Sequence, residues 1–206
     1  MKVRIAYIEE PPFYWTGKDR AATGADIEWD MNVPIFATAE RAKHVAFSVP
    51  VWSLGDGFVV RQGNPKALTS YEAVAARSDA RLGIIPGQIQ LGSAKSAGVS
   101  DGQIVMFKDQ PEAVAALLAG KVDAFAATAV GNRVIADTHA ELEAVAHEIG
   151  ENSSAPVGAF SFRIGNDRLL HDVNRKLSEY LGSADHRSRM AKYGIMKTEI
   201  DSVIGR

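Results

Sequence analysis

The sequence predicts an α/β protein, and three observations support this prediction. Short apolar or β-branched segments alternate with helix-like segments through the middle of the chain. Several helix-like segments are rich in alanine, as in AVAAR and AVAALLAGK, which lets a helix lie close against a sheet. Glycine and proline separate the segments, as in PG after LGII and GNP after FVVRQ. Such alternation favours parallel strands covered by helices.

The individual elements follow from apolar periodicity and from boundary signals. We expect strands at residues 3–8, 54–60, 82–85, 104–107, 122–127 and 157–163. We expect helices at residues 69–76, 88–97, 110–119, 129–137, 167–181 and 185–193. Thr69 or Ser70 is the N-cap expected for the first helix, and Pro111 and Gly120 bound the third.

The composition excludes several classes of protein. The chain has 206 residues, of which 46% are hydrophobic and 23% charged, as in an ordinary globular protein. With 23 basic and 25 acidic side chains and no basic stripe, we expect no nucleic-acid partner. The lack of cysteine excludes disulfides and thiolate metal sites. Met1 and Lys2 lead directly into a strand pattern, so we expect the mature form of an exported protein, without its signal peptide.

The segment PIFATAERAKHVAFSVPVW, residues 34–52, places Phe36 five residues before Arg41. Arg41 lies at the start of an expected helix, 38–43, and its guanidinium offers a planar pair of donors to a carboxylate. Phe36 offers an aromatic face to a cation. The alternative interpretation is a surface arginine that pairs with Glu40 or Asp30, together with a core phenylalanine.

The first expected strand is followed by Glu10 and Phe13, at the end where open α/β sheets bind ligands. Glu10 can pair with a ligand cation and Phe13 can stack on it. The alternative places Phe13 in the core and Glu10 in solvent. Trp15 is a further candidate, and Trp52 either closes the pocket or has a structural role.

The sequence lacks the usual patterns of enzymes. None of the five histidines has a metal-ligand spacing, and the chain has no G-x-S-x-G, G-x-G-x-x-G or Walker pattern. Acid–base catalysis needs a second ionisable group, and only Glu10 is placed at the expected site. We therefore expect no catalytic residue, no metal and no cofactor.

Segments along nearly the whole chain resemble one known family. They are EEPPF, TGADIE, residues 29–52, LGIIPGQIQ, EAVAALLAGKVDAF and GAFSFRIGNDRLLHDVNRKL. In this order they resemble the solute-binding proteins of polar amino-acid ABC transporters, the bacterial extracellular solute-binding protein family 3. Within that family they are most similar to binders of ectoine and of other compatible-solute or opine-like ligands.

The resemblance implies a two-lobed periplasmic binding protein type II fold. Lobe I would comprise residues 1–53 and 158–206, and lobe II residues 54–157. The implied function is periplasmic capture of a small zwitterionic ligand by closure about a hinge, followed by delivery to an ABC transporter permease. We expect a monomer. The alternatives on the same fold are an enzyme similar to cyclohexadienyl dehydratase and a ligand-sensing domain.

The resemblance also assigns roles to single residues. Arg41 corresponds to the arginine that clamps the α-carboxylate of the ligand. Gln88 replaces the hydroxyl residue of a Gly-Thr-like turn, which keeps the backbone donor. Thr128 stands where the family has an aspartate that binds the α-ammonium group, and this difference argues against a plain α-amino acid as the ligand.

One departure from the family pattern follows Glu28. A helix-strand-helix stretch of roughly 30 residues, judged from the size of such a unit, is absent before Trp29. Lobe I is therefore incomplete in this sequence, either because the stretch is omitted, which the undisturbed flanks favour, or because it is deleted. A true deletion would favour a swapped dimer.

Overall fold

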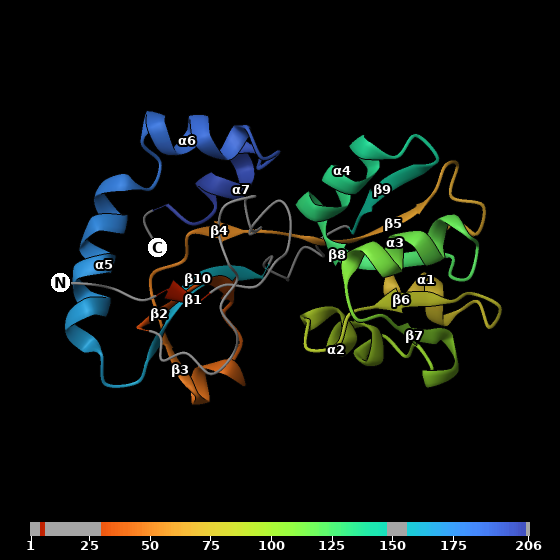
Figure 1. Cartoon of the computed structure of the whole chain (residues 1–206), viewed down its shortest axis with the longest axis horizontal. Helices are drawn as coiled ribbons and strands as arrows, with labels where there is room; N and C mark the ends of the chain where they lie inside the picture. The colour runs from red at the N-terminus through yellow and green to blue at the C-terminus, as the bar shows by residue number, and fades with distance from the viewer. Residues whose placement is uncertain (1–4, 7–29, 148–155, 205–206) are drawn as a thin grey trace. The chain divides into compact units, whose positions relative to one another are not determined.

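The structure is a computed structural model that describes residues 5–6, 30–147 and 156–204 (Figure 1). The chain divides into two compact units, each containing one sheet. Unit 1 comprises Met1–Leu54 and Pro156–Arg206, and unit 2 comprises Gly55–Ala155. The prediction of an α/β protein is confirmed.

The sheet of unit 1 is built around its last strand. Its strands are β1 (Ile5–Ala6), β2 (Met31–Phe36), β3 (Val45–Phe47), β4 (Trp52–Ser53) and β10 (Val157–Arg163). The order is β1-β2-β10-β3, with β4 also paired to β10. β1 runs parallel to β2, whereas β10 runs antiparallel to β2, β3 and β4. A strand that returns from the other unit thus joins three N-terminal segments.

The described helices of unit 1 are η1 (Arg41–Lys43), α5 (Asp167–Tyr180), α6 (Ala184–Ala191) and α7 (Lys197–Asp201). Leu169 of α5 forms a buried cluster with Met31 of β2 and Phe162 of β10. Leu170 and Val173 pack against that cluster. These positions lie on one helical face, which is why α5 can cover the sheet (Figure 1).

The sheet of unit 2 contains β5 (Asp56–Arg61), β6 (Leu82–Ile84), β7 (Ile104–Met106), β8 (Ala124–Thr128) and β9 (Leu142–Ala146). Their order is β7-β6-β8-β5-β9. β6 is parallel to β7 and β8, and β5 is antiparallel to β8 and β9. The carboxyl ends of β6 and β8 therefore lie at the same end of the sheet as the start of β5, where Asp56 is opposite Thr128.

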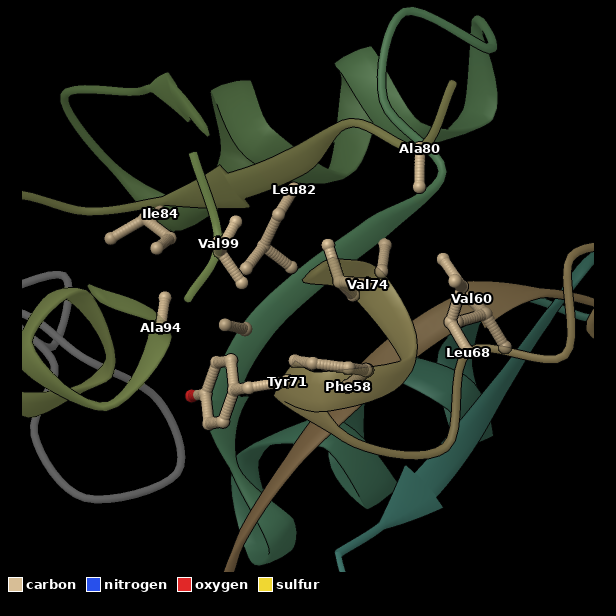
Figure 2. Packing of buried hydrophobic residues seen from close by; sticks show 12 residues of the cluster. Phe58, Val60, Leu68, Tyr71, Val74, Ala80, Leu82, Ile84, Ala94 and Val99 are labelled. Atoms are coloured by element: carbon tan, nitrogen blue, oxygen red, sulfur yellow. The ribbon is translucent and has the colours of Figure 1, made fainter. Parts of the chain in front are cut away.

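Helices cover both faces of this sheet. They are α1 (Tyr71–Ala75), α2 (Ile89–Ser96), α3 (Gln110–Leu118) and α4 (Ala129–Thr138), with a 3-10 turn η2 (Asp101–Gln103). Phe58 and Val60 of β5 join one core with residues of α1 and α2, shown in Figure 2. Val59, between them, joins a second core with residues of α3. The alternation of strand side chains thus produces three layers.

The structure differs from the sequence-based expectations in three respects. The helix expected at residues 38–43 is only the 3-10 turn η1. The short elements β3, β4, β9 and α7 were not predicted, because segments this short lack a clear period. The expected parallel pairing is wrong for β5 and β10, which run antiparallel to their partners, because pairing between strands distant in sequence leaves no local signal. The departure from the family pattern after Glu28 lies outside the described residues.

Candidate functional site

In unit 1, Arg41 is held beside the end of β2. The Arg41 N–H donates to Thr38 Oγ1 at 3.2 Å, which closes the turn that leads into η1. The guanidinium Nη1 donates to the carbonyl oxygen of Phe36 at 2.9 Å. The side chain therefore folds back across its own loop to the backbone of the last residue of the strand.

The Phe36 ring is packed against a second aromatic ring. Phe36 and Trp52 meet edge to face, with ring centroids 5.0 Å apart and an interplanar angle of 86°. Trp52 is only 7% exposed, and its indole lies over Gly158, where a Cβ atom would overlap the ring. Gly158 is also the strand partner of Phe36. We call Phe36, Arg41 and Trp52 the arginine loop.

The interpretation of Arg41 as a surface arginine named Glu40 and Asp30 as its partners, and the structure describes the ion pair of Glu40. Glu40 forms its ion pair with Lys43, one turn further along η1. Phe36 is half-buried rather than a fully enclosed core residue. The loop therefore combines a positioned guanidinium with a partly accessible ring, which suits recognition of a small molecule that carries a carboxylate.

In unit 2, a carboxylate lies at the end of the sheet where β5 begins. Oδ2 of Asp56 accepts from the Tyr71 hydroxyl at 2.6 Å. Oδ1 accepts from Gln90 Nε2 at 3.0 Å and from the Gly57 N–H at 3.1 Å. Burial raises the pKa of Asp56, although the hydrogen bonds from Tyr71 and Gln90 act to lower it. The carboxylate is thus oriented by neutral donors in a poorly hydrated position.

A histidine completes this cluster, which we call the Asp56 corner: Asp56, Tyr71, Gln90 and His147. The backbone N–H of His147 donates to the backbone oxygen of Asp56 at 3.0 Å. Its ring meets those of Phe58 and Tyr71 edge to face, at centroid distances of 4.3 and 4.8 Å. Burial lowers the pKa of His147 to about 4, so the imidazole is neutral near pH 7. Burial and the negative charge of Asp56 both raise the pKa of Tyr71.

Two residues predicted from the sequence lie at this same end of the sheet. Thr128 ends β8, and its Oγ1 accepts from the Gly131 N–H at 3.1 Å as the N-cap of α4. Gln88 is the N-cap residue of α2, and its side chain makes no capping hydrogen bond. Gln88 is two residues from Gln90, so the turn before α2 and the end of β8 both border the Asp56 corner.

The predicted site residues therefore fall into three groups. Phe36 and Arg41 are brought together in unit 1, and Gln88 and Thr128 lie at one end of the sheet in unit 2. The remaining candidates, Glu10, Phe13 and Trp15, lie outside the described residues.

The members of the Asp56 corner were not predicted from the sequence. The one available signal was the acidic residue within the apolar segment LGDGFVV, where a charge is out of place unless it has a role.

Residues 30–147 and 156–204 contain no group of three or more side chains arranged to hold a metal ion. Within the same ranges, no helix combines the length and apolar character that a bilayer crossing requires.

The chain matches known proteins in sequence. The family model described as bacterial extracellular solute-binding proteins, family 3, matches residues 20–194. The chain is 29% identical over 173 residues to the probable amino-acid ABC transporter periplasmic-binding protein y4tE of Sinorhizobium fredii (strain NBRC 101917 / NGR234). That alignment covers 80% of this chain and 55% of y4tE, so the chain spans about half the length of this relative.

The fold matches solved structures of the periplasmic binding protein type II class. The crystal structure of EhuB in complex with hydroxyectoine superposes with a TM-score of 0.80 at 22% identity, covering 97% of this chain and 91% of that chain. An ancestral arginine-binding protein bound to arginine gives a TM-score of 0.67 at 26% identity, covering 80% and 71%. Because the family model spans most of the sequence and the architecture agrees, this chain belongs to the bacterial extracellular solute-binding proteins, family 3.

Proposed function

We propose that this protein captures a small zwitterionic, amino-acid-like solute in the bacterial periplasm and delivers it to the permease of an ABC transporter. Unit 1 holds the anionic group of the solute through the arginine loop. Delivery to the permease is inferred from the role of the family. Measurements of solute uptake by cells test this part of the proposal.

The arginine loop is the observation that carries the proposal. The bond from Arg41 Nη1 to the Phe36 oxygen orients the guanidinium at the end of β2. A guanidinium is a planar fork of donors that matches a carboxylate, and it stays charged at any physiological pH. The Phe36 ring, packed against Trp52, belongs to the same loop and can shelter the less polar part of a small solute.

The relatives support the same class of solute. One curated relative is described as a probable amino-acid transporter component, and the solved structures contain hydroxyectoine in one case and arginine in the other. Both ligands carry a carboxylate and a delocalised cation. We therefore propose a solute of this type rather than a sugar or a metal ion.

Isothermal titration calorimetry with a panel of solutes tests the proposal. The panel contains arginine, other amino acids, ectoine, hydroxyectoine, betaines and opines. Replacing Arg41 with alanine should weaken binding of the tightest solute by about 30- to 5000-fold, because removing one partner of a buried charge pair costs about 2–5 kcal/mol. Arg41→Lys should recover part of the affinity, since lysine keeps the charge but loses the planar fork.

Lys43→Ala is the matched control. Lys43 lies in the same 3-10 turn, carries the same charge and pairs with exposed Glu40, so its removal should leave affinity within about threefold. Equal affinity of Arg41→Ala and the wild type would remove Arg41 from the site. A wild-type protein that binds no solute of the panel would overturn the proposed function itself.

The same samples separate capture from catalysis. A binding protein returns its solute unchanged, whereas the dehydratase alternative consumes it. Proton NMR of the solute after prolonged incubation with the protein should show a single unaltered species. New resonances that grow with protein concentration would favour an enzyme.

A further inference from the structure

We propose that Asp56 is the counter-charge that unit 2 offers to the cationic group of the captured solute. The inference rests on the proposed function and adds a binding residue to it. It concerns the Asp56 corner alone and is carried by three observations: the position of the carboxylate, its described partners and the consequences of its burial.

The position of Asp56 places it among the residues expected to bind the solute. It is the first residue of β5 and lies opposite Thr128 in the ladder between β5 and β8. Its side chain reaches Gln90, in the first turn of α2, two residues after Gln88. Asp56 is thus located where two strands end and two helices begin, which is where ligands bind in α/β sheets.

The described partners of Asp56 are all neutral donors. They are the Tyr71 hydroxyl, the Gln90 amide and the Gly57 N–H. Within residues 30–147 and 156–204, no lysine, arginine or histidine forms an ion pair with this carboxylate. A carboxylate accepts about four hydrogen bonds, and the described donors supply three. One acceptor position on Oδ2 therefore suits an N–H group of a cation.

The burial of this carboxylate has a cost that a purely structural role does not explain. Desolvation raises the pKa of Asp56, which means that the folded protein disfavours the charged form. An asparagine would avoid that cost, because its one oxygen could accept from Gln90 and Gly57 while its Nδ2 donates to the Tyr71 oxygen. Tyr71 and Gln90, both buried, hold the carboxylate in one orientation instead. A bound cation would offset the desolvation, so the arrangement suits a site that is prepared for a positive ligand group.

Figure 2 shows the Tyr71 ring beside Phe58, with its hydroxyl at the margin of the packed apolar residues rather than among them. This hydroxyl makes the 2.6 Å bond to Asp56. The ring is fixed by the core, and the polar end orients the carboxylate. Tyr71 is therefore a positioning residue in this proposal, and Asp56 is the group that meets the solute.

The experiment compares Asp56→Asn with the wild type, using arginine and hydroxyectoine as probes in calorimetry and in thermal unfolding. Asp56→Asn should weaken the probe that the wild type binds by about 10- to 100-fold, because the cation loses its buried partner. In the absence of any probe, the variant should melt at the same temperature as the wild type or higher, because the desolvated charge is gone.

Asp123→Asn is the matched control in the same unit. Asp123 immediately precedes β8 and holds Lys66 at 3.0 Å, so its loss should lower the melting temperature and leave affinity within about twofold. Unchanged affinity of Asp56→Asn would overturn the inference, as would a loss of affinity accompanied by a lower melting temperature without probe. A wild-type protein that binds neither probe nor any other solute of the panel would overturn the proposed function and this inference together.

Discussion

Gly57→Ala should destabilise unit 2 because the added methyl group has no space. A Cβ atom at Gly57 would lie 2.5 Å from the backbone oxygen of Val145 and 3.2 Å from Nδ2 of Asn132. Ordinary carbon contacts begin at about 3.5 Å, so the first distance is short by about 1 Å. The contacted oxygen belongs to the backbone of β9, which pairs with β5 where Gly57 is opposite Ala146. This oxygen can move only if the ladder between β5 and β9 is disturbed.

Overpacking of this kind costs about 1–3 kcal/mol, and the involvement of backbone places Gly57→Ala near the upper limit. For a protein of this size, that corresponds to a fall in melting temperature of about 4–12 °C. Far-UV circular dichroism measures the melting temperature. Amide hydrogen exchange should show faster exchange in β9, which is the terminal strand of its sheet and the element able to shift.

Gly92→Ala is the control, because it makes the same substitution where there is space. Gly92 lies within α2, and nothing lies within 4 Å of the Cβ that alanine would add. Alanine in a helix interior should raise stability by about 0.5–1 kcal/mol. A Gly57→Ala protein that melts within about 1 °C of the wild type would show that β9 yields without cost, and the packing argument would fail.

Two further predictions concern the Asp56 corner. Tyr71→Phe removes the donor to Asp56 Oδ2 and should cost about 1–3 kcal/mol in urea denaturation, whereas a loss below about 0.5 kcal/mol would contradict the assigned bond. His147 has its pKa lowered to about 4 by burial, so the unfolded chain takes up the proton first as the pH falls. The free energy of unfolding should not depend on His147 above about pH 6.5, and it should fall as the pH drops from 6.5 to 4. The fall should be less than about 1.4 kcal/mol per pH unit, because solvent screens the site. Urea denaturation at several pH values should show a flatter dependence for His147→Gln, and equal slopes for both proteins would refute the assignment.

Much of the secondary structure was predictable because local patterns determine it. The apolar positions Leu169, Leu170 and Val173 define one face of α5, and the predicted helix at 167–181 matches Asp167–Tyr180. The strand predicted at 157–163 matches β10. The directions of β5 and β10 were not predictable, because pairing between strands distant in sequence leaves no local signal.

The candidate site likewise has a part that was predictable from local sequence. Phe36 and Arg41 are close in sequence, so the segment itself brought both residues to one loop, where Arg41 donates to the Phe36 backbone oxygen. The roles of Phe36, Arg41, Gln88 and Thr128 in binding stay predictions that the titrations will test.

The α/β class, most of the helices and the family to which the chain belongs follow from residue patterns along the chain. Only the tertiary structure brought Asp56 to Tyr71 and Gln90, which are 15 and 34 residues away, and to the end of β8. The register of the β5–β8 ladder and the packing of α1 and α2 against it decide those contacts. A single acidic residue in an apolar strand has no pattern of its own, so its partners and the consequences of its burial exist only in the folded chain.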